Sequence, residues 1–231
     1  MKAITTFSAK NYDDYAHRLL KSIDRWPGTL IAYVEEQPDF THEKIEYRDF
    51  WDVKLPGGPS IQDFIDEVTN MGLDGGDPYN YNEDVAKFCR KVFVQYDALK
   101  GQKDKMFWLD ADIEITDDIP KEFLQDLFMG HPLCYLGRQG FYSECSFIGF
   151  DMSHNILRHF LSDYVSMFTT GQILQYKWWH DCTAFDVTRQ KYDIFGHNLS
   201  PYFRMGRGLH VFPDSVLADY MRHDKGNRKY K

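Results

Sequence analysis

Apolar residues along the chain form short runs that are separated by longer amphipathic segments. Three runs have the length of buried strands: residues 3–7, 29–34 and 106–109. Between the first two runs, apolar side chains recur at helical spacing from Tyr12 to Ile23, and Pro27 ends the pattern. This order of strand, helix and strand predicts an α/β fold in which helices cover a parallel sheet.

Two further helices are predicted in the middle of the chain. Ser60 is a typical N-cap residue for the first of them. The second, longer helix is predicted to begin at Asn82 or Glu83 and to end at Gly101. No internal repeat, low-complexity tract or flexible linker interrupts the sequence, so we expect residues 1–231 to form one domain.

The composition agrees with one domain that has a sizeable core. The chain has 231 residues, of which 43% are hydrophobic and 16% are aromatic. Lysine and arginine total 27 against 35 for aspartate and glutamate, which gives a formal net charge of −8. This balance argues against broad nucleic-acid binding, because such binding requires a basic surface. It is compatible with a small anionic ligand if a metal ion or a local basic cluster binds that ligand.

The sequence also predicts a soluble, cytoplasmic protein with reduced thiols. The first residues include no apolar stretch of signal-peptide length, and no segment approaches the roughly 18 consecutive apolar residues of a membrane-spanning helix. The cysteines form no C-x-x-C pair, which favours free thiols over a disulfide framework or a zinc site. They are Cys89, Cys134, Cys145 and Cys182.

Two aspartates directly follow the third predicted strand. Asp110 and Asp112 flank Ala111, so both carboxylates face one side of an extended backbone. In open α/β sheets the carboxyl ends of the strands border the ligand-binding crevice, and paired carboxylates are suitable ligands for Mg²⁺ or Mn²⁺. The alternative is an acidic loop that only caps a strand or the following helix.

The C-terminal segment is basic although the chain as a whole is acidic. Residues 222–231 contain five lysines and arginines and a single acidic residue. Within this segment His223 offers a nitrogen ligand for a transition metal, and Gly226 allows backbone N–H groups to approach a phosphate closely. Together with the two aspartates, the segment indicates a metal ion with bound phosphate. A solvated basic tail is the alternative.

Six motifs, taken in order, resemble those of a GT-A type glycosyltransferase. They are similar to motifs of a small bacterial and phage family: TTFS, DVAKFCRKVF, FWLDAD, ECSFIGF, WHDCTAFD and HDKGNRK. The wider glycogenin-like families share the D-x-D pair and the terminal His-Gly-Lys arrangement. The resemblance implies a single GT-A (Rossmann-like) α/β domain over residues 1–231, with a mixed, mainly parallel central sheet flanked by helices.

The same resemblance implies an activity. A metal-dependent hexosyltransferase of this type moves a sugar from a UDP-sugar donor to an acceptor, here an unidentified glycan, lipid or protein, with retention at the anomeric carbon. Mn²⁺ or Mg²⁺ is the implied cofactor, and Asp110, Asp112 and His223 are its implied ligands. Such a protein would act in the cytoplasm, which is the host cytoplasm if a phage encodes it.

The resemblance assigns the donor contacts to several parts of the chain. Thr5, Thr6 and Phe7 would frame the uracil and ribose, unless Phe7 is a core residue. Lys87 and Lys91 are four residues apart on one helix face and would reach the diphosphate or the donor sugar, unless they form a solvated stripe. The remaining donor contacts would be Asp110 and Ala111 beside the ribose, and Gly226 and Lys229 at the leaving phosphate.

Glu144 and Asp181 are the candidate catalytic residues on the sugar and acceptor side. Glu144 opens an apolar run, where a carboxylate can accept hydrogen bonds from sugar hydroxyls. Asp181 lies just after Trp178 and Trp179, and aromatic faces beside a carboxylate commonly bind a pyranose. Either acid would also serve as the base of an inverting route. Alternatively, the tryptophans belong to the core and Asp181 caps a helix that begins at Cys182.

Two other classes of function stay open at this point. A metal-dependent phosphohydrolase or nuclease also uses clustered aspartates, although a two-metal site normally has more acids than Asp110 and Asp112. A nonenzymatic protein that binds sugar nucleotides on the same fold is the other class. The sequence departs from the family pattern at Cys145, where glycine is usual, and at Cys182, where glycogenin-like relatives carry an amide.

Overall fold

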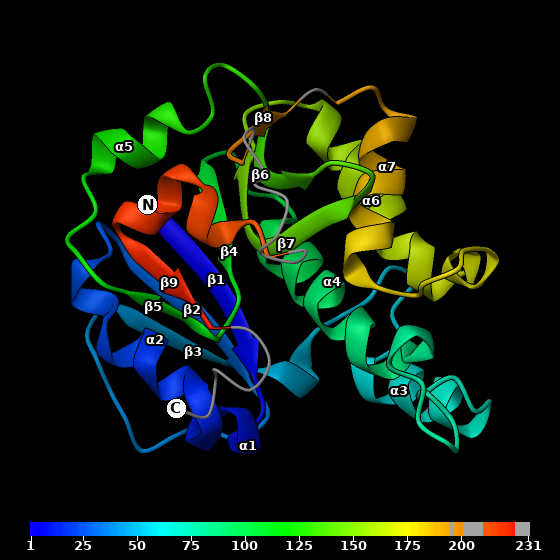
Figure 1. Cartoon of the computed structure of the whole chain (residues 1–231). Coiled ribbons are helices and arrows are strands. Elements are labelled where there is room, and N and C mark those ends of the chain that lie inside the picture. The colour runs from blue at the N-terminus through cyan, green and yellow to red at the C-terminus, as the bar shows by residue number, and fades with distance from the viewer. Residues whose placement is uncertain (195, 201–209, 225–231) are drawn as a thin grey trace.

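A seven-stranded sheet forms the centre of the computed structural model, which describes residues 1–194, 196–200 and 210–224 (Figure 1). Its strands lie in the order β3 (Ile45–Asp49), β2 (Thr29–Val34), β1 (Lys2–Phe7), β4 (Lys105–Leu109), β7 (Phe141–Asp151), β6 (Leu133–Arg138) and β8 (His197–Asn198). Neighbouring strands are parallel except at β7, which runs antiparallel to both β4 and β6. The prediction of an α/β fold with a mixed, mainly parallel sheet is therefore confirmed.

Helices cover both faces of the sheet, because most of its strands are apolar on both faces. On one face α4 (Val85–Leu99) and α7 (Asp181–Lys191) pack against the sheet, while α3 (Ile61–Asn70) and α6 (Ile156–Thr169) pack against these helices in the same core. The other face is covered by α2 (His17–Lys21), α5 (Lys121–Asp126) and a small second sheet. Within the described residues, no helix is both long and apolar enough to cross a membrane.

The helical stretch after β1 is less regular than its periodicity predicts. Ser8 caps α1 (Ala9–Asn11), which continues into a π-helical turn at Tyr12–Ala16 and then into α2. A 3₁₀ turn at Ile23–Arg25 ends the stretch just before Pro27, as predicted. The stretch still buries one apolar side against the sheet, so the periodicity identified its inner face correctly.

The two helices predicted in the middle of the chain are both present. Ser60 caps α3, which confirms that prediction. The start of α4 is Val85 rather than residue 82 or 83, because the Asp84 side chain accepts the backbone N–H of Lys87 and caps the helix there. A separate 3₁₀ turn occupies residues 81–83.

The second sheet brings the C-terminal part of the chain to the end of β4. It consists of β5 (Ile113–Ile115) and β9 (Met221–His223), which pair in antiparallel fashion with Ile113 opposite His223. Figure 1 shows these two strands side by side over the sheet, close to α2. The backbone N–H of Asp224 also donates to the carbonyl of Asp112 at 3.3 Å. Backbone pairing thus fixes where the last described residues lie.

Candidate functional site

The three residues predicted to bind a metal ion lie together beyond the carboxyl end of β4. His223 Nε2 is 3.1 Å from Asp112 Oδ1. One ligand atom from each of Asp110, Asp112 and His223 can be chosen so that all three lie within 4.8 Å of one another. Asp110 and Asp112 follow the end of β4, and β9, which pairs with β5, supplies the histidine. The structure therefore places two carboxylates and one imidazole in one cluster.

This donor set fits Mn²⁺ or Mg²⁺, and the nitrogen favours Mn²⁺, because imidazole suits transition metals better than magnesium. Electrostatics support the fit. Burial lowers the pKa of His223, but hydrogen bonds to Asp112 and Glu144 outweigh burial and raise the pKa to about 9. The surrounding carboxylates thus favour positive charge at the imidazole, which is the environment that a divalent cation requires.

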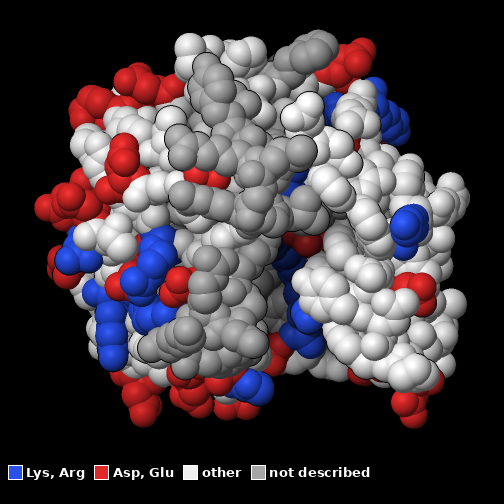
Figure 2. All heavy atoms as spheres, viewed as in Figure 1, with Lys and Arg blue, Asp and Glu red and all other residues white. Residues whose placement is uncertain are grey.

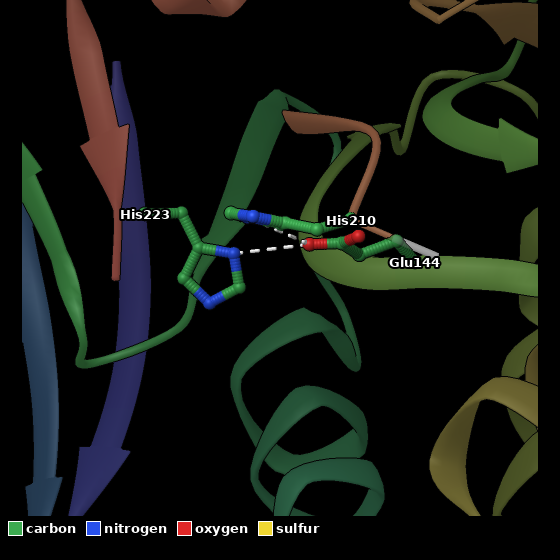
Figure 3. Close-up of side chains that lie close together, drawn as sticks. All are labelled: Glu144, His210 and His223. Atoms are coloured by element: carbon green, nitrogen blue, oxygen red, sulfur yellow. Dashed lines mark hydrogen bonds and ion pairs between the residues drawn. The ribbon is translucent and has the colours of Figure 1, made fainter. Parts of the chain in front are cut away.

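Glu144 contacts the other nitrogen of the same imidazole (Figure 3). Its Oε1 lies 3.0 Å from His223 Nδ1 and 3.7 Å from His210 Nε2. Its Oε2 accepts the backbone N–H of Val211 at 3.2 Å. The strand register between β6 and β7 shifts on either side of Leu136, which pairs with Glu144. Such irregularities redirect side chains near functional sites.

Lys91 links the end of β4 to the start of α7. Its Nζ is 2.7 Å from Asp110 Oδ1 and 2.8 Å from Asp181 Oδ2, and it donates to the Cys145 carbonyl at 2.9 Å. Burial lowers the pKa of Lys91, but the two carboxylates outweigh burial and raise it well above its usual value. Lys91 is therefore a charged side chain that holds two predicted site residues in place.

A cavity of 580 Å³ opens beside this cluster on the side of β1. Its lining includes seven of the residues predicted to contact donor or metal: Thr6, Phe7, Lys87, Lys91, Asp110, Ala111 and Asp112. Arg90 also lines it and forms an ion pair with Glu35. Figure 2 shows basic and acidic atoms together in the hollow between the two sides of the molecule. This mixture suits an anion that is bound through both lysine and metal.

Thr5 does not follow the prediction made for it. Its side chain is fully buried, and it is not part of the lining of the cavity. Successive strand residues point to opposite faces, so Thr6 reaches the cavity while Thr5 points into the protein interior. The structure therefore does not place the Thr5 side chain in the cavity, unlike those of Thr6 and Phe7.

A second cavity, of 480 Å³, adjoins the first and shares Lys87, Lys91 and Asp110 with it. Both candidate catalytic acids, Glu144 and Asp181, line it. Further lining residues are Tyr81, Phe88, Arg138, Cys145, Ser146, His180, Cys182 and His223. The two cavities therefore share Asp110 of the candidate metal-binding cluster, and a ligand beside Asp110 would lie next to both.

The two tryptophans before Asp181 were interpreted either as part of a sugar site or as core residues, and the structure shows features of both. Trp179 packs against the core, whereas Trp178 lines a further cavity of 180 Å³ and stacks with His180 at a ring distance of 6.5 Å. The N-cap of α7 is His180, and Asp181 is the first helical residue. The alternative in which Asp181 caps a helix beginning at Cys182 is therefore wrong.

Two predicted residues lie outside the described part of the chain, namely Gly226 and Lys229. The sequence interpretation also missed a residue beside the cluster, His210. The sequence around His210 shows no helical or strand periodicity, and its contacts with Glu144 and His223 become apparent only in the folded chain.

No family model matches the chain, and no curated protein matches it. Solved glycosyltransferase structures do match. The bifunctional glycosyltransferase WbbM is 11% identical, with a TM-score of 0.54 over 98% of this chain and 46% of that one. This chain therefore spans less than half of the WbbM chain. Mouse xyloside xylosyltransferase 1 is 12% identical, with a TM-score of 0.53 over 95% of this chain and 92% of that one.

The galactosyltransferase LgtC, solved with donor and acceptor sugar analogues, is 13% identical, with a TM-score of 0.50 over 98% of this chain and 88% of that one. The chain has a GT-A fold. In this fold the cluster of Asp110, Asp112 and His223 lies beyond the carboxyl ends of parallel strands, where open α/β sheets bind their ligands.

Proposed function

We propose that this chain is a metal-dependent glycosyltransferase that moves a sugar from a UDP-sugar donor to an unidentified glycan, lipid or protein acceptor. The observation that carries the proposal is the cluster of Asp110, Asp112 and His223 at the junction of two cavities in a GT-A fold. A divalent ion at such a cluster neutralises charge on a diphosphate leaving group.

The residues around the cluster support a division of roles between the two cavities. In the first, Thr6 and Phe7 would frame the nucleoside, and Lys87 would add positive charge near the diphosphate. Lys87 Nζ lies 4.4 Å from the centre of the Tyr81 ring, so its position is already restricted by a cation–π contact. In the second, Asp181 would face the donor sugar and the acceptor.

A phosphohydrolase or nuclease with two metal ions is less well supported by the same geometry. Asp181 lies close to Asp110, but the ammonium group of Lys91 lies between them, 2.7 Å from Asp110 and 2.8 Å from Asp181. A second cation would be repelled by Lys91 at that position.

The test follows UDP release from a panel of UDP-sugars in the presence of Mn²⁺, with and without EDTA. We expect release with at least one donor, and its loss on chelation. Asp112→Asn and His223→Ala should each reduce release by about 100-fold or more, since the ion contributes several kcal/mol to stabilising the leaving group. Asp118→Asn is the matched control, because Asp118 is exposed and lines neither cavity.

Two outcomes would contradict the proposal. Cleavage of nucleic acid without UDP release from any donor would favour the nuclease class, and UDP binding without turnover would favour a nonenzymatic binding protein.

We also propose retention at the anomeric carbon, because the terminal motif resembles that of retaining enzymes. The anomeric proton of the product, observed by NMR as it forms, tests this point separately.

A further inference from the structure

Both oxygens of the buried Glu144 carboxylate accept hydrogen bonds. Its side chain is 2% exposed. One oxygen, Oε1, contacts His223 Nδ1 at 3.0 Å and accepts the Ser146 hydroxyl at 3.3 Å. The other oxygen accepts the backbone N–H of Val211. Glu144 therefore has a fixed position with respect to the imidazole.

The imidazole itself is confined by rings as well as by this hydrogen bond. The ring of His210 meets that of His223 edge-on, with centroids 5.1 Å apart, and the ring of Phe212 lies at 5.5 Å. Both belong to the segment that Glu144 anchors through Val211. Figure 3 shows Glu144 and His210 reaching His223 from the side of β7, while β9 carries His223.

The two ring nitrogens of His223 have different partners, and this difference has a chemical consequence. When Nδ1–H donates to Glu144, the lone pair of the neutral imidazole is on Nε2. Nε2 is the atom that lies 3.1 Å from Asp112. Because Nε2 also faces a carboxylate, an ion that binds there would replace a proton on Nε2, and the hydrogen bond to Glu144 would keep the remaining proton on Nδ1.

We propose that Glu144 is a positioning residue for metal binding: it orients His223 and holds the proton on Nδ1, so that Nε2 is presented to the ion together with Asp110 and Asp112. This assignment rests on the proposed metal-dependent function. It gives Glu144 a role behind the histidine, on the opposite side of the imidazole from Asp112, and not as a ligand or as the base that contacts the sugar. Carboxylates that hold a ligating histidine in this way commonly affect metal affinity strongly.

The test measures Mn²⁺ affinity at one fixed pH from the electron paramagnetic resonance signal of free Mn²⁺, without any substrate. Glu144→Leu removes the acceptor, and we expect its affinity to fall by about 10–100-fold. Glu144→Gln keeps an oxygen that can accept the hydrogen bond from His223 Nδ1–H, so the Mn²⁺ affinity of this variant should stay within about 10-fold of that of the wild-type protein. With Co²⁺ in place of Mn²⁺, the visible absorption spectrum should be retained in the glutamine variant and altered in the leucine variant.

Asp151→Asn is the matched control. Asp151 is a buried acid on the same strand, β7, and pairs with Lys105 at 2.7 Å, but it lines neither of the two cavities. It should lose stability without losing Mn²⁺ affinity. Circular dichroism identifies the folded variants, and if Glu144→Leu does not fold, Glu144→Ala and the glutamine variant replace it.

Three results would overturn the inference. Unchanged Mn²⁺ affinity in folded Glu144→Leu or Glu144→Ala would show that Glu144 only stabilises the fold. Equal, severe losses in the glutamine and leucine variants, or binding of two ions per chain with one lost in Glu144→Gln, would show that Glu144 ligates a metal directly. If the wild-type protein fails to bind Mn²⁺, the proposed metal-dependent function itself fails; this result can be told apart from the others because it does not depend on any Glu144 variant.

Discussion

Removal of the Lys91 charge tests how the site is held together. In Lys91→Met the methionine fills much of the same space but leaves Asp110 and Asp181 without their shared cation. The side chain of Asp181 is 7% exposed, and that of Lys91 is 16% exposed, so water replaces the lost contact poorly. Breaking a buried ion pair by removing one partner costs about 3–5 kcal/mol. For a chain of this length that is a decrease in melting temperature of about 6–20 °C.

The assay is thermal unfolding followed by circular dichroism, together with a double-mutant cycle. Asp181→Asn alone should destabilise the protein, because it leaves the Lys91 ammonium with one partner fewer. In the Lys91→Met background the same substitution should cost much less or stabilise, since it removes an unpaired carboxylate. A loss below about 1 kcal/mol in Lys91→Met, or strictly additive effects in the cycle, would refute the reasoning.

Three further predictions concern the metal cluster and the core. The raised pKa keeps a proton on His223 up to about pH 9, and Mn²⁺ must displace that proton. The affinity of the protein for Mn²⁺ should therefore rise about tenfold per pH unit between pH 7 and 8 and level off above pH 9. An affinity that does not change with pH, measured by paramagnetic resonance, would contradict this. The metal-free protein gains stability from the same raised pKa, fully below about pH 6.5, and loses it as the pH rises to about 9; unfolding of His223→Ala should lack this decline. In Gly149→Ala the new methyl group would lie 2.4 Å from Cys134 Sγ and 2.8 Å from Phe128 Cζ, which should cost about 1–3 kcal/mol; Cys134→Ala should restore part of the melting temperature, and no loss in the single variant would count against the packing argument.

The parts of the fold that were predicted correctly depend on local sequence. The strands β2 and β4 are mostly apolar runs, β1 is short and rich in residues that favour strands, and Ser60 caps α3 by a contact within four residues. The acidic pair after β4 was likewise visible, because two aspartates directly follow a buried strand. Such signals involve neighbours in the chain, so they can be recognised without knowledge of the tertiary structure.

The parts that were missed depend on contacts between distant residues. β9 is a strand only because it pairs with β5, and no periodicity in three residues predicts that. The residue types of the C-terminal segment and the family resemblance predicted that His223 joins the aspartates, but its position in the sequence alone did not. The ion pairs of Lys91 and the contact of His210 with Glu144 likewise join separate elements. Their partners follow from the packing of helices and strands, which the sequence pattern does not specify.

The pairing of β5 with β9 also affects local unfolding. His223 is placed by a strand of three residues, aided by an ion pair between Arg18 and Asp224 at 2.9 Å. So short a ladder opens more readily than the seven-stranded sheet beneath it. A cation held by Asp112 and His223 would stabilise the pairing of β5 with β9, because it would bind the folded form and not the opened one. Ion binding should then slow deuterium uptake at the amides of residues 221–223, even without any substrate.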